Sequence, residues 1–349
     1  MTNHRGDYCF THTTGDDVFL FRLQNAARTE VLVTNYGAII TSFKIKKQDG
    51  TVNDIVLGFD KVEDYLTAGY LRQYPWFGAA IGRHANRIKD AAFELNGKKY
   101  LLTKNEGNEQ LHGGDGGFDR RAWQFAGQGT APQSWLELTY KSPAGEEGFP
   151  GNLDVTIRFE LNDKDELSYT YTATCDEPTV VNLTHHDYFN LDNGEGTIKE
   201  HAIKIHSDAV LEQDEQLVAN GTISPVAGTA FDFREFTSIG DGLSKMQNPA
   251  GYDKSFVVER KENALVAEAK SLQSGLLLQV YSTEPVVHFY SGKWIPVIKG
   301  KNGTEYGPFS GFCLETQSHP NAVNIPHFPG NILNPGEIYH HKTVYKVNR

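Results

Sequence analysis

The sequence of 349 residues contains few cysteines and none of the spacings that bind zinc or carry redox chemistry. Its three cysteines, Cys9, Cys175 and Cys313, lie far apart, and no C-x-x-C pair occurs. This usage argues against a zinc ribbon or a redox motif, and it suits a reducing compartment. A chain of this length buries most of the surface that its unfolded form exposes, so it needs no disulfide or metal staple.

Long apolar runs and an excess of positive charge are also absent. No stretch approaches the ~20 apolar residues that span a bilayer, and residues 1–17 lack the apolar segment of a secretory signal. The chain has 33 basic and 44 acidic residues and a net charge of −11, whereas nucleic acids and anionic membranes select basic patches. We therefore expect a cytoplasmic protein with neither a nucleic-acid partner nor a membrane partner.

Motifs for phosphate cofactors and for nucleophilic catalysis are missing as well. No G-x-S-x-G elbow occurs. The glycine-rich segment His112–Phe118 is followed by neither a helix pattern nor a Lys-Ser/Thr pair, so it is no P-loop or dinucleotide fingerprint. It is either a flexible hairpin loop or a backbone that approaches a ligand closely, with His112 at its entrance.

The 13 histidines raise the question of a metal site. No H-E-x-x-H motif occurs. The neighbours His185 and His186 would point to opposite faces of a strand and could not hold one ion together, and the same holds for His340 and His341. We therefore expect no metal and no cofactor.

Alternation with a period of two dominates the chain. Leu153–Leu161 and Leu167–Cys175 alternate apolar and polar residues, which is typical of strands with one buried face. The polar link Asn162–Glu166 predicts a hairpin between them. Asn96-Gly97 tolerates the positive φ angles of a two-residue hairpin turn. The one helical signal is Lys61–Leu66.

Many short strands separated by turns predict an all-β fold, either a large antiparallel sandwich or a barrel. The 34 glycines and 14 prolines are spread throughout the chain. No linker-like run, low-complexity tract or solenoid repeat divides it. We therefore expect one domain over residues 1–349, in which residues 1–20 form a loosely ordered lead-in.

Glu315 and His186 are candidate acid–base residues, and each has a plainer alternative. Glu315 lies in the largely apolar strand Gly311–Gln317. It is either at a sheet edge facing water or buried with a raised pKa. His186 is either a hydrogen-bonded core histidine or a proton donor. Arg87 and Asp253 have equally plain alternatives, a surface charge and a turn cap.

Taken together and in order, eight segments resemble the galactose mutarotases, also called aldose 1-epimerases. Each segment is weak evidence alone, but eight in collinear order are specific. The likeness covers roughly Val31 to the C-terminus, and the matching segments are Ile81–Ile88, Leu111–Gly114, Gly116–Asp119, Glu146–Gly151, Asn182–Asn190, Gly228–Asp232, Gly251–Asp253 and Gly311–Gln317.

The resemblance implies a mutarotase-type β-sandwich, a monosaccharide substrate and a monomer or homodimer. The implied reaction interconverts the α and β anomers of a free aldose, such as D-galactose or D-glucose. In it Glu315 takes the proton of the C1 hydroxyl as general base, and His186 protonates the ring oxygen as general acid. The residues implied to contact the substrate are Asn86, Arg87, His112, Tyr188, Asp253 and His288.

Three positions depart from the pattern of the family that the chain resembles. The family commonly has Asn where this chain has His185, and Ser or Thr where it has Asp187. It often has a substrate-contacting Gln at His288. These departures leave the implied acid and base in place and leave the sugar preference open.

Two other functions remain open. The chain could be a non-catalytic sugar-binding or regulatory protein on the same fold, since fold does not determine function. It could also be a glycosidase that uses two carboxylates such as Glu315 and Asp253.

Overall fold

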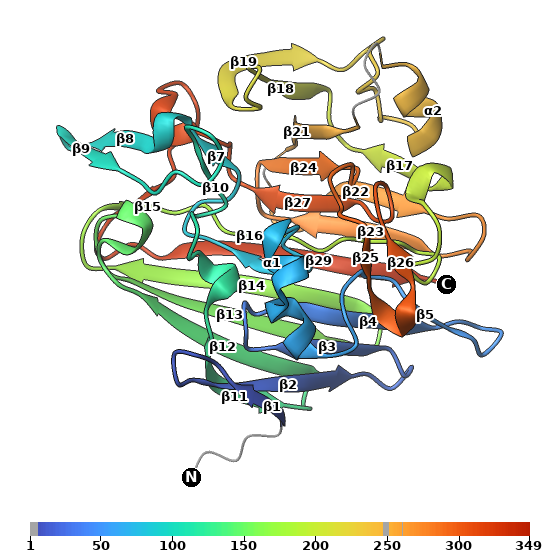
Figure 1. The fold of residues 1–349 in the computed structure, drawn as a ribbon. Coiled ribbons are helices and arrows are strands. Elements are labelled where there is room, and N and C mark those ends of the chain that lie inside the picture. The colour runs from blue at the N-terminus through green and yellow to red at the C-terminus, as the bar shows by residue number, and fades with distance from the viewer. Residues whose placement is uncertain (1–5, 247–250, 260) are drawn as a thin grey trace.

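Strands dominate the structure, a computed structural model that describes residues 6–246, 251–259 and 261–349 (Figure 1). The described α-helices are short, namely α1 (Ala68–Arg72) and α2 (Ile239–Ser244). Where the sequence predicts a helical turn at Lys61–Leu66, the structure has a 3-10 helix at Val62–Leu66. The predicted all-β class is confirmed. None of the described helices has the length and hydropathy needed to span a bilayer.

The largest sheet is antiparallel and contains the predicted hairpin. β13 (Leu153–Leu161) pairs with β14 (Glu166–Cys175), and every second residue of β13 is buried. The strand order is β11 (Gln124–Gly129), β12 (Ser134–Ser142), β13, β14, β29 (Tyr339–Asn348), β23 (Leu277–Ser282), β22 (Ala264–Lys270), β17 (Ala202–Ile205) and β20 (Thr237–Ser238).

An N-terminal sheet packs against this large sheet through β2, which contacts β12 and β13. The sheet holds β1 (Asp7–Thr11), β2 (Asp17–Gln24), β3 (Glu30–Thr34), β4 (Ile40–Lys46) and β5 (Val52–Asp54) in that order. Residues 1–20 were expected to be a loosely ordered lead-in, but Asp7–Thr11 form β1 and residues 17–20 are the start of β2. The reason is that β2 buries Phe21 and Leu23 in the main core. Residues 1–5 lie outside the described residues.

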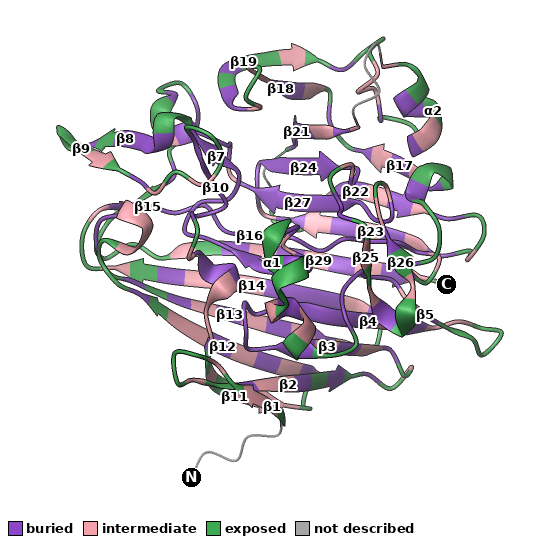
Figure 2. Cartoon of the chain, viewed as in Figure 1, coloured by how far each residue is buried: buried purple, intermediate pink, exposed green. Residues whose placement is uncertain are grey.

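A third sheet carries several polar residues of the candidate active site. Its order is β19 (Ala219–Pro225), β18 (Ala209–Gln213), β21 (Asp253–Val257), β24 (Val286–Tyr290) and β27 (Cys313–Gln317). All five residues of β24 and all five of β27 are buried (Figure 2). Leu314 and Phe289 belong to the main core, so the opposite faces of these strands place polar side chains out of water.

Short paired strands close the space next to β27. β16 (Thr184–His185) pairs with β6 (Ala80–Ile81) and contacts β27. β7 (Arg87–Ile88) pairs with β10 (Gln110–Leu111). The Asn96-Gly97 turn joins β8 (Ala92–Leu95) to β9 (Lys98–Leu101), and both turn residues have positive φ as predicted.

Arg83 anchors the segment that leads to β7. Its guanidinium is buried and donates hydrogen bonds to the backbone carbonyls of Ser142, Pro143, Pro150 and Gly151, and to the hydroxyl of Ser142. Desolvation lowers the pKa of Arg83 to about 10, so the group remains a cation at neutral pH. One side chain therefore satisfies carbonyl groups on two loops.

We expect Arg83→Met to lower the free energy of unfolding by roughly 3 kcal/mol or more, because it leaves several buried carbonyls without a donor. Urea denaturation measures this loss. Arg22→Met is the control: Arg22 is largely exposed and forms a surface ion pair with Glu30, so its loss should cost less than about 1 kcal/mol. Equal losses in the two variants would mean that Arg83 is not an anchor.

Candidate active site

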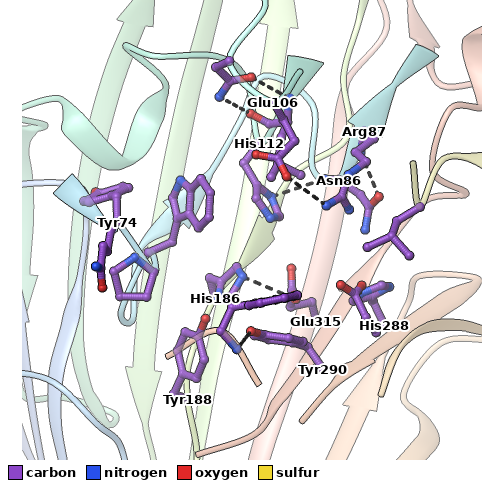
Figure 3. A pocket seen from close by; sticks show the side chains of 18 of the residues that line it. Tyr74, Asn86, Arg87, Glu106, His112, His186, Tyr188, His288, Tyr290 and Glu315 are labelled. Carbon is purple, nitrogen blue, oxygen red and sulfur yellow. Dashed lines mark hydrogen bonds and ion pairs between the residues drawn. The ribbon is translucent and has the colours of Figure 1, made fainter. Parts of the chain in front are cut away.

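A pocket of about 570 Å³ is lined by residues of β7, β10, β21, β24 and β27 and of the segment that follows β16. Its size is within the usual range for small-molecule sites. All eight residues that the sequence suggested for catalysis or substrate contact line it: Asn86, Arg87, His112, His186, Tyr188, Asp253, His288 and Glu315. Figure 3 labels each of them except Asp253.

Glu315 lies on the pocket face of β27, directly opposite His288 on β24. It is buried, with 2% of its surface exposed, which decides between the two alternatives that the sequence allowed. Its Oε1 lies 3.6 Å from Nε2 of His186, and its Oε2 has no hydrogen-bond partner within the described part of the chain. Burial raises the pKa of Glu315 to about 7, although His288 opposes the shift. The carboxyl group can therefore exchange a proton near neutral pH.

His186 follows β16, and its backbone is held on both sides. Its N–H donates to the carbonyl of Ala79, and its own carbonyl accepts from Gly78. Burial lowers the pKa of the ring to about 3. Nδ1 lies 3.5 Å from Sγ of Cys313, whose pKa burial raises well above the ordinary value. The protonated thiol can donate to Nδ1, which leaves the proton of the neutral ring on Nε2, toward Glu315.

His112 follows β10 with a φ of 52°, and its ring lies edge-on to that of His186, 5.2 Å between centroids. The backbone N–H of Asn86 donates to its Nδ1 at 3.3 Å. Burial lowers the pKa of His112 well below the ordinary value, so the ring is neutral and its proton is on Nε2. His112 thus offers a hydrogen-bond donor.

The glycines after His112 serve contact between backbone segments. Gly113 has a φ of +85°, and a Cβ there would lie 2.0 Å from the carbonyl oxygen of Gly82. A Cβ on Gly114 would meet the carboxylate of Glu147. Neither of the two earlier interpretations, a flexible loop or a close approach to a ligand, describes this arrangement. The glycines let the His112 loop pack directly on the Gly82 segment.

Charged and amide groups form another part of the pocket wall. Asn86 accepts a hydrogen bond from the backbone N–H of Arg87, and the guanidinium of Arg87 lies 3.6 Å from Glu106. Burial alone would raise the pKa of Asp253. The hydrogen bond from His288 and the charges of His288 and Arg87 outweigh it, so the pKa lies below its ordinary value. Asp253 is therefore a carboxylate.

Apart from Tyr188, the tyrosine and tryptophan residues of the lining were not identified from the sequence. Trp76 lies 4.8 Å from His112 and 6.0 Å from His186 between ring centroids, and Tyr74, Tyr290 and Trp294 also line the pocket. No local pattern marks these residues, because they come from loops and from a strand far apart in the chain. Their rings offer apolar surface beside the polar groups.

His185 and Asp187 lie on the other side of the chain from His186. Nε2 of His185 donates to the carbonyl of Ala38 at 3.1 Å, and Nδ1 lies 3.0 Å from Asp187. Both residues are fully buried and neither lines the pocket. The sequence-based expectation that His185 and His186 face opposite ways is met.

His112, His186 and Glu315 are the residues that could hold a metal ion, since each offers one ligand atom and these atoms lie within 4.8 Å of one another. A metal would need a ring nitrogen of His112 without a proton. Nδ1 already accepts from Asn86, and Nε2 carries the proton of the neutral ring. The residues therefore fit a metal poorly. The absence of a metal from the reaction stays a prediction.

Comparisons with known proteins identify relatives of the chain. Residues 20–346 match the family model described as aldose 1-epimerase. A galactose mutarotase from Bos taurus is 43% identical over 331 residues, covering 94% of this chain and 93% of that protein. An aldose 1-epimerase from Escherichia coli is 34% identical, covering 95% and 96%.

Solved structures show the same fold. An aldose epimerase homologue from C. elegans has a TM-score of 0.87 at 29% identity, covering 95% of this chain and 98% of that one. A galactose 1-epimerase from Lactobacillus acidophilus has a TM-score of 0.85 at 26% identity, covering 99% and 98%.

The fold and the pocket thus define an isomerase of the β-sandwich class. The chain belongs to the aldose 1-epimerase family.

We expect Gly113→Ala to destabilise the fold and displace His112, because the new Cβ would collide with the backbone of Gly82. The matched control is Gly97→Ala. Gly97 also has positive φ, at +74°, but nothing lies within 4 Å of its Cβ position. Both variants incur the cost of positive φ, about 1 kcal/mol, and only Gly113→Ala incurs the collision. Thermal unfolding compares them, and equal shifts would contradict a packing role for Gly113.

Proposed function

We propose that the chain interconverts the α and β anomers of a free aldose such as D-galactose or D-glucose, with Glu315 as general base and His186 as general acid. The observation that carries the proposal is the buried pair itself, a carboxyl and an imidazole 3.6 Å apart in the pocket. The names of the relatives, galactose mutarotase and aldose 1-epimerase, support the substrate class.

In the proposed reaction, ring opening moves two protons. Glu315 takes the proton of the C1 hydroxyl, the C1–O5 bond breaks as C1 becomes a carbonyl, and His186 gives its proton to O5. Rotation about C1–C2 then presents the other face of the carbonyl, and the steps reverse. No electrons are transferred and no phosphate moves, so the reaction requires neither a nicotinamide nor a nucleotide.

Burial suits the intermediate of this reaction. Before ring opening, Glu315 is a carboxylate and His186 is an imidazolium, so the pair holds one transferable proton. After ring opening that pair is a carboxylic acid and a neutral imidazole, again with one proton. Desolvation raises the pKa of Glu315 and lowers that of His186, and both shifts favour the uncharged arrangement. The pocket therefore stabilises the form of the pair that accompanies the open-chain sugar.

The remaining lining residues would hold the sugar. The Nε2–H of His112 and the guanidinium of Arg87 are donors, and the carboxylate of Asp253 is an acceptor for hydroxyl groups. Tyr188 packs beside His186, with 5.0 Å between ring centroids, and Trp76 offers a face for the apolar side of the ring. A few placed polar groups among aromatic surfaces are usual for small-molecule sites.

We expect Glu315→Gln and His186→Asn each to lower the rate of anomerisation by about 10²–10⁴-fold, because each removes one proton-transfer group. Polarimetry on freshly dissolved α-D-galactose and α-D-glucose measures the rate. Glu235→Gln and His340→Asn, at exposed positions, are the matched controls, and circular dichroism checks the fold. A wild-type rate in either site variant would refute that residue's role.

A related outcome separates the proposal from the alternatives. Saturable sugar binding by the wild-type protein without any rate enhancement would identify a non-catalytic sugar-binding protein. Release of a reducing sugar from a glycoside would identify a glycosidase.

We expect a bell-shaped dependence of kcat/KM on pH. The pair must hold one proton, so activity should fall as pH rises through about 7, where Glu315 loses it. Activity should fall again in acid, well below the ordinary range of a histidine, where His186 gains a second proton. These limits belong to the coupled pair. Initial rates across buffers from about pH 2 to 9 reach both limits, and a flat profile would contradict an acid–base pair.

A further inference from the structure

Three side chains from two neighbouring strands form a continuous line of hydrogen bonds that ends in the pocket. Ser255 and His288 are direct partners across β21 and β24, and Asp253 lies two residues before Ser255 on the same face. The Oγ of Ser255 lies 2.8 Å from Nδ1 of His288. Nε2 of His288 lies 2.9 Å from Oδ1 of Asp253.

The direction of these hydrogen bonds follows from the chemistry of the groups. A carboxylate only accepts, so Nε2 of His288 carries a proton and donates it to Asp253. The hydroxyl of Ser255 can donate to Nδ1 when the ring is neutral and accept from it when the ring is protonated. Both ring nitrogens of His288 are thereby used within the protein. The ring forms part of the pocket wall, but it has no nitrogen left for a sugar hydroxyl.

Asp253 depends on this contact for its orientation. Within the described part of the chain, its carboxylate has no other hydrogen bond or ion pair. Its side chain is 22% exposed, against 4% for that of His288. One carboxylate oxygen is thus held by His288, and the other is available in the pocket. A buried donor that fixes one oxygen of a ligand-binding carboxylate also restricts where the second oxygen points.

We propose that His288 is a positioning residue: with Ser255 behind it, it holds Asp253 so that the free carboxylate oxygen accepts a hydroxyl of the bound sugar. This inference rests on the proposed function. It assigns His288 a part in substrate recognition that runs through Asp253.

The same three residue types occur in nucleophilic triads, but the arrangement here is reversed. In such a triad the serine faces the substrate and the carboxylate lies behind the histidine. Here Ser255 is 1% exposed and does not line the pocket, and Asp253 does. The end of the line that meets a ligand is therefore the carboxylate, and Ser255 holds the far nitrogen of the His288 ring.

Three variants test the proposal with D-galactose as the probe. His288→Leu removes the donor, and we expect KM to rise about 10–100-fold with kcat changed by no more than a few-fold, since a hydrogen bond to a charged group is lost. His288→Gln has an amide that can donate to Asp253 and accept from Ser255, so KM should stay within about 3-fold of wild type. Ser255→Ala leaves the ring in place without its second hydrogen-bond partner and should raise KM by a smaller factor than His288→Leu.

A double-substitution cycle with Asp253→Asn adds a readout that general damage to the fold would not give. If His288 acts through Asp253, His288→Leu should add little to KM in the Asp253→Asn background. Calorimetric titration with D-galactose should follow the same order of affinities as KM.

Each outcome is decisive. An unchanged KM in His288→Leu, additive effects in the cycle, or a His288→Gln variant as impaired as His288→Leu would overturn the proposal. If His288→Leu does not fold, Ser255→Ala and His288→Gln still test it through their opposite expectations. A wild-type protein that binds galactose without anomerising it would overturn the proposed function alone, because the calorimetric order still tests positioning.

Discussion

The desolvation of Glu315 is the constraint on which the site depends. A carboxyl group with one oxygen lacking a hydrogen bond within the described residues is costly to bury, and the cost appears as a pKa raised to about 7. The surrounding structure has to keep water out while it leaves room for a ligand. The main core on the opposite face of β27 and the closely packed Gly82–Gly113 contact meet this requirement from two sides.

Successive side chains of a strand point to opposite faces of the sheet, so the two faces have different functions. On β27, Glu315 lines the pocket and Cys313 contacts the ring of His186, whereas Leu314 packs in the main core. After β16, His186 and Tyr188 line the pocket, whereas His185 and Asp187 pair behind it. Pairing between β21, β24 and β27 then places Ser255, His288 and Glu315 side by side. Of two residues that are adjacent in the sequence, one thus contributes to the pocket and the other packs behind it.

Alternation and turn chemistry were sufficient to predict β13, β14 and the Asn96-Gly97 hairpin, because these depend on local contacts. The eight pocket residues were found through ordered motifs. The packing of β2, the steric role of Gly113 and the aromatic lining were missed, since each depends on residues distant in sequence. Burial of Glu315 could not be derived locally either, because an edge strand and a buried strand share the same pattern of residues.

The three departures from the family pattern differ in how they can affect a bound sugar. His185 and Asp187 lie outside the pocket, so they can affect a sugar only through the backbone of His186 or through their charges. His288 lies in the wall and opposite the base, but both its nitrogens are engaged by Ser255 and Asp253. Variation at this position therefore changes the orientation of the Asp253 carboxylate, and it leaves the distance between Glu315 and His186 unchanged. Because His288 also opposes the raised pKa of Glu315, a change at this position acts on the proposed base through charge as well as on the sugar through Asp253.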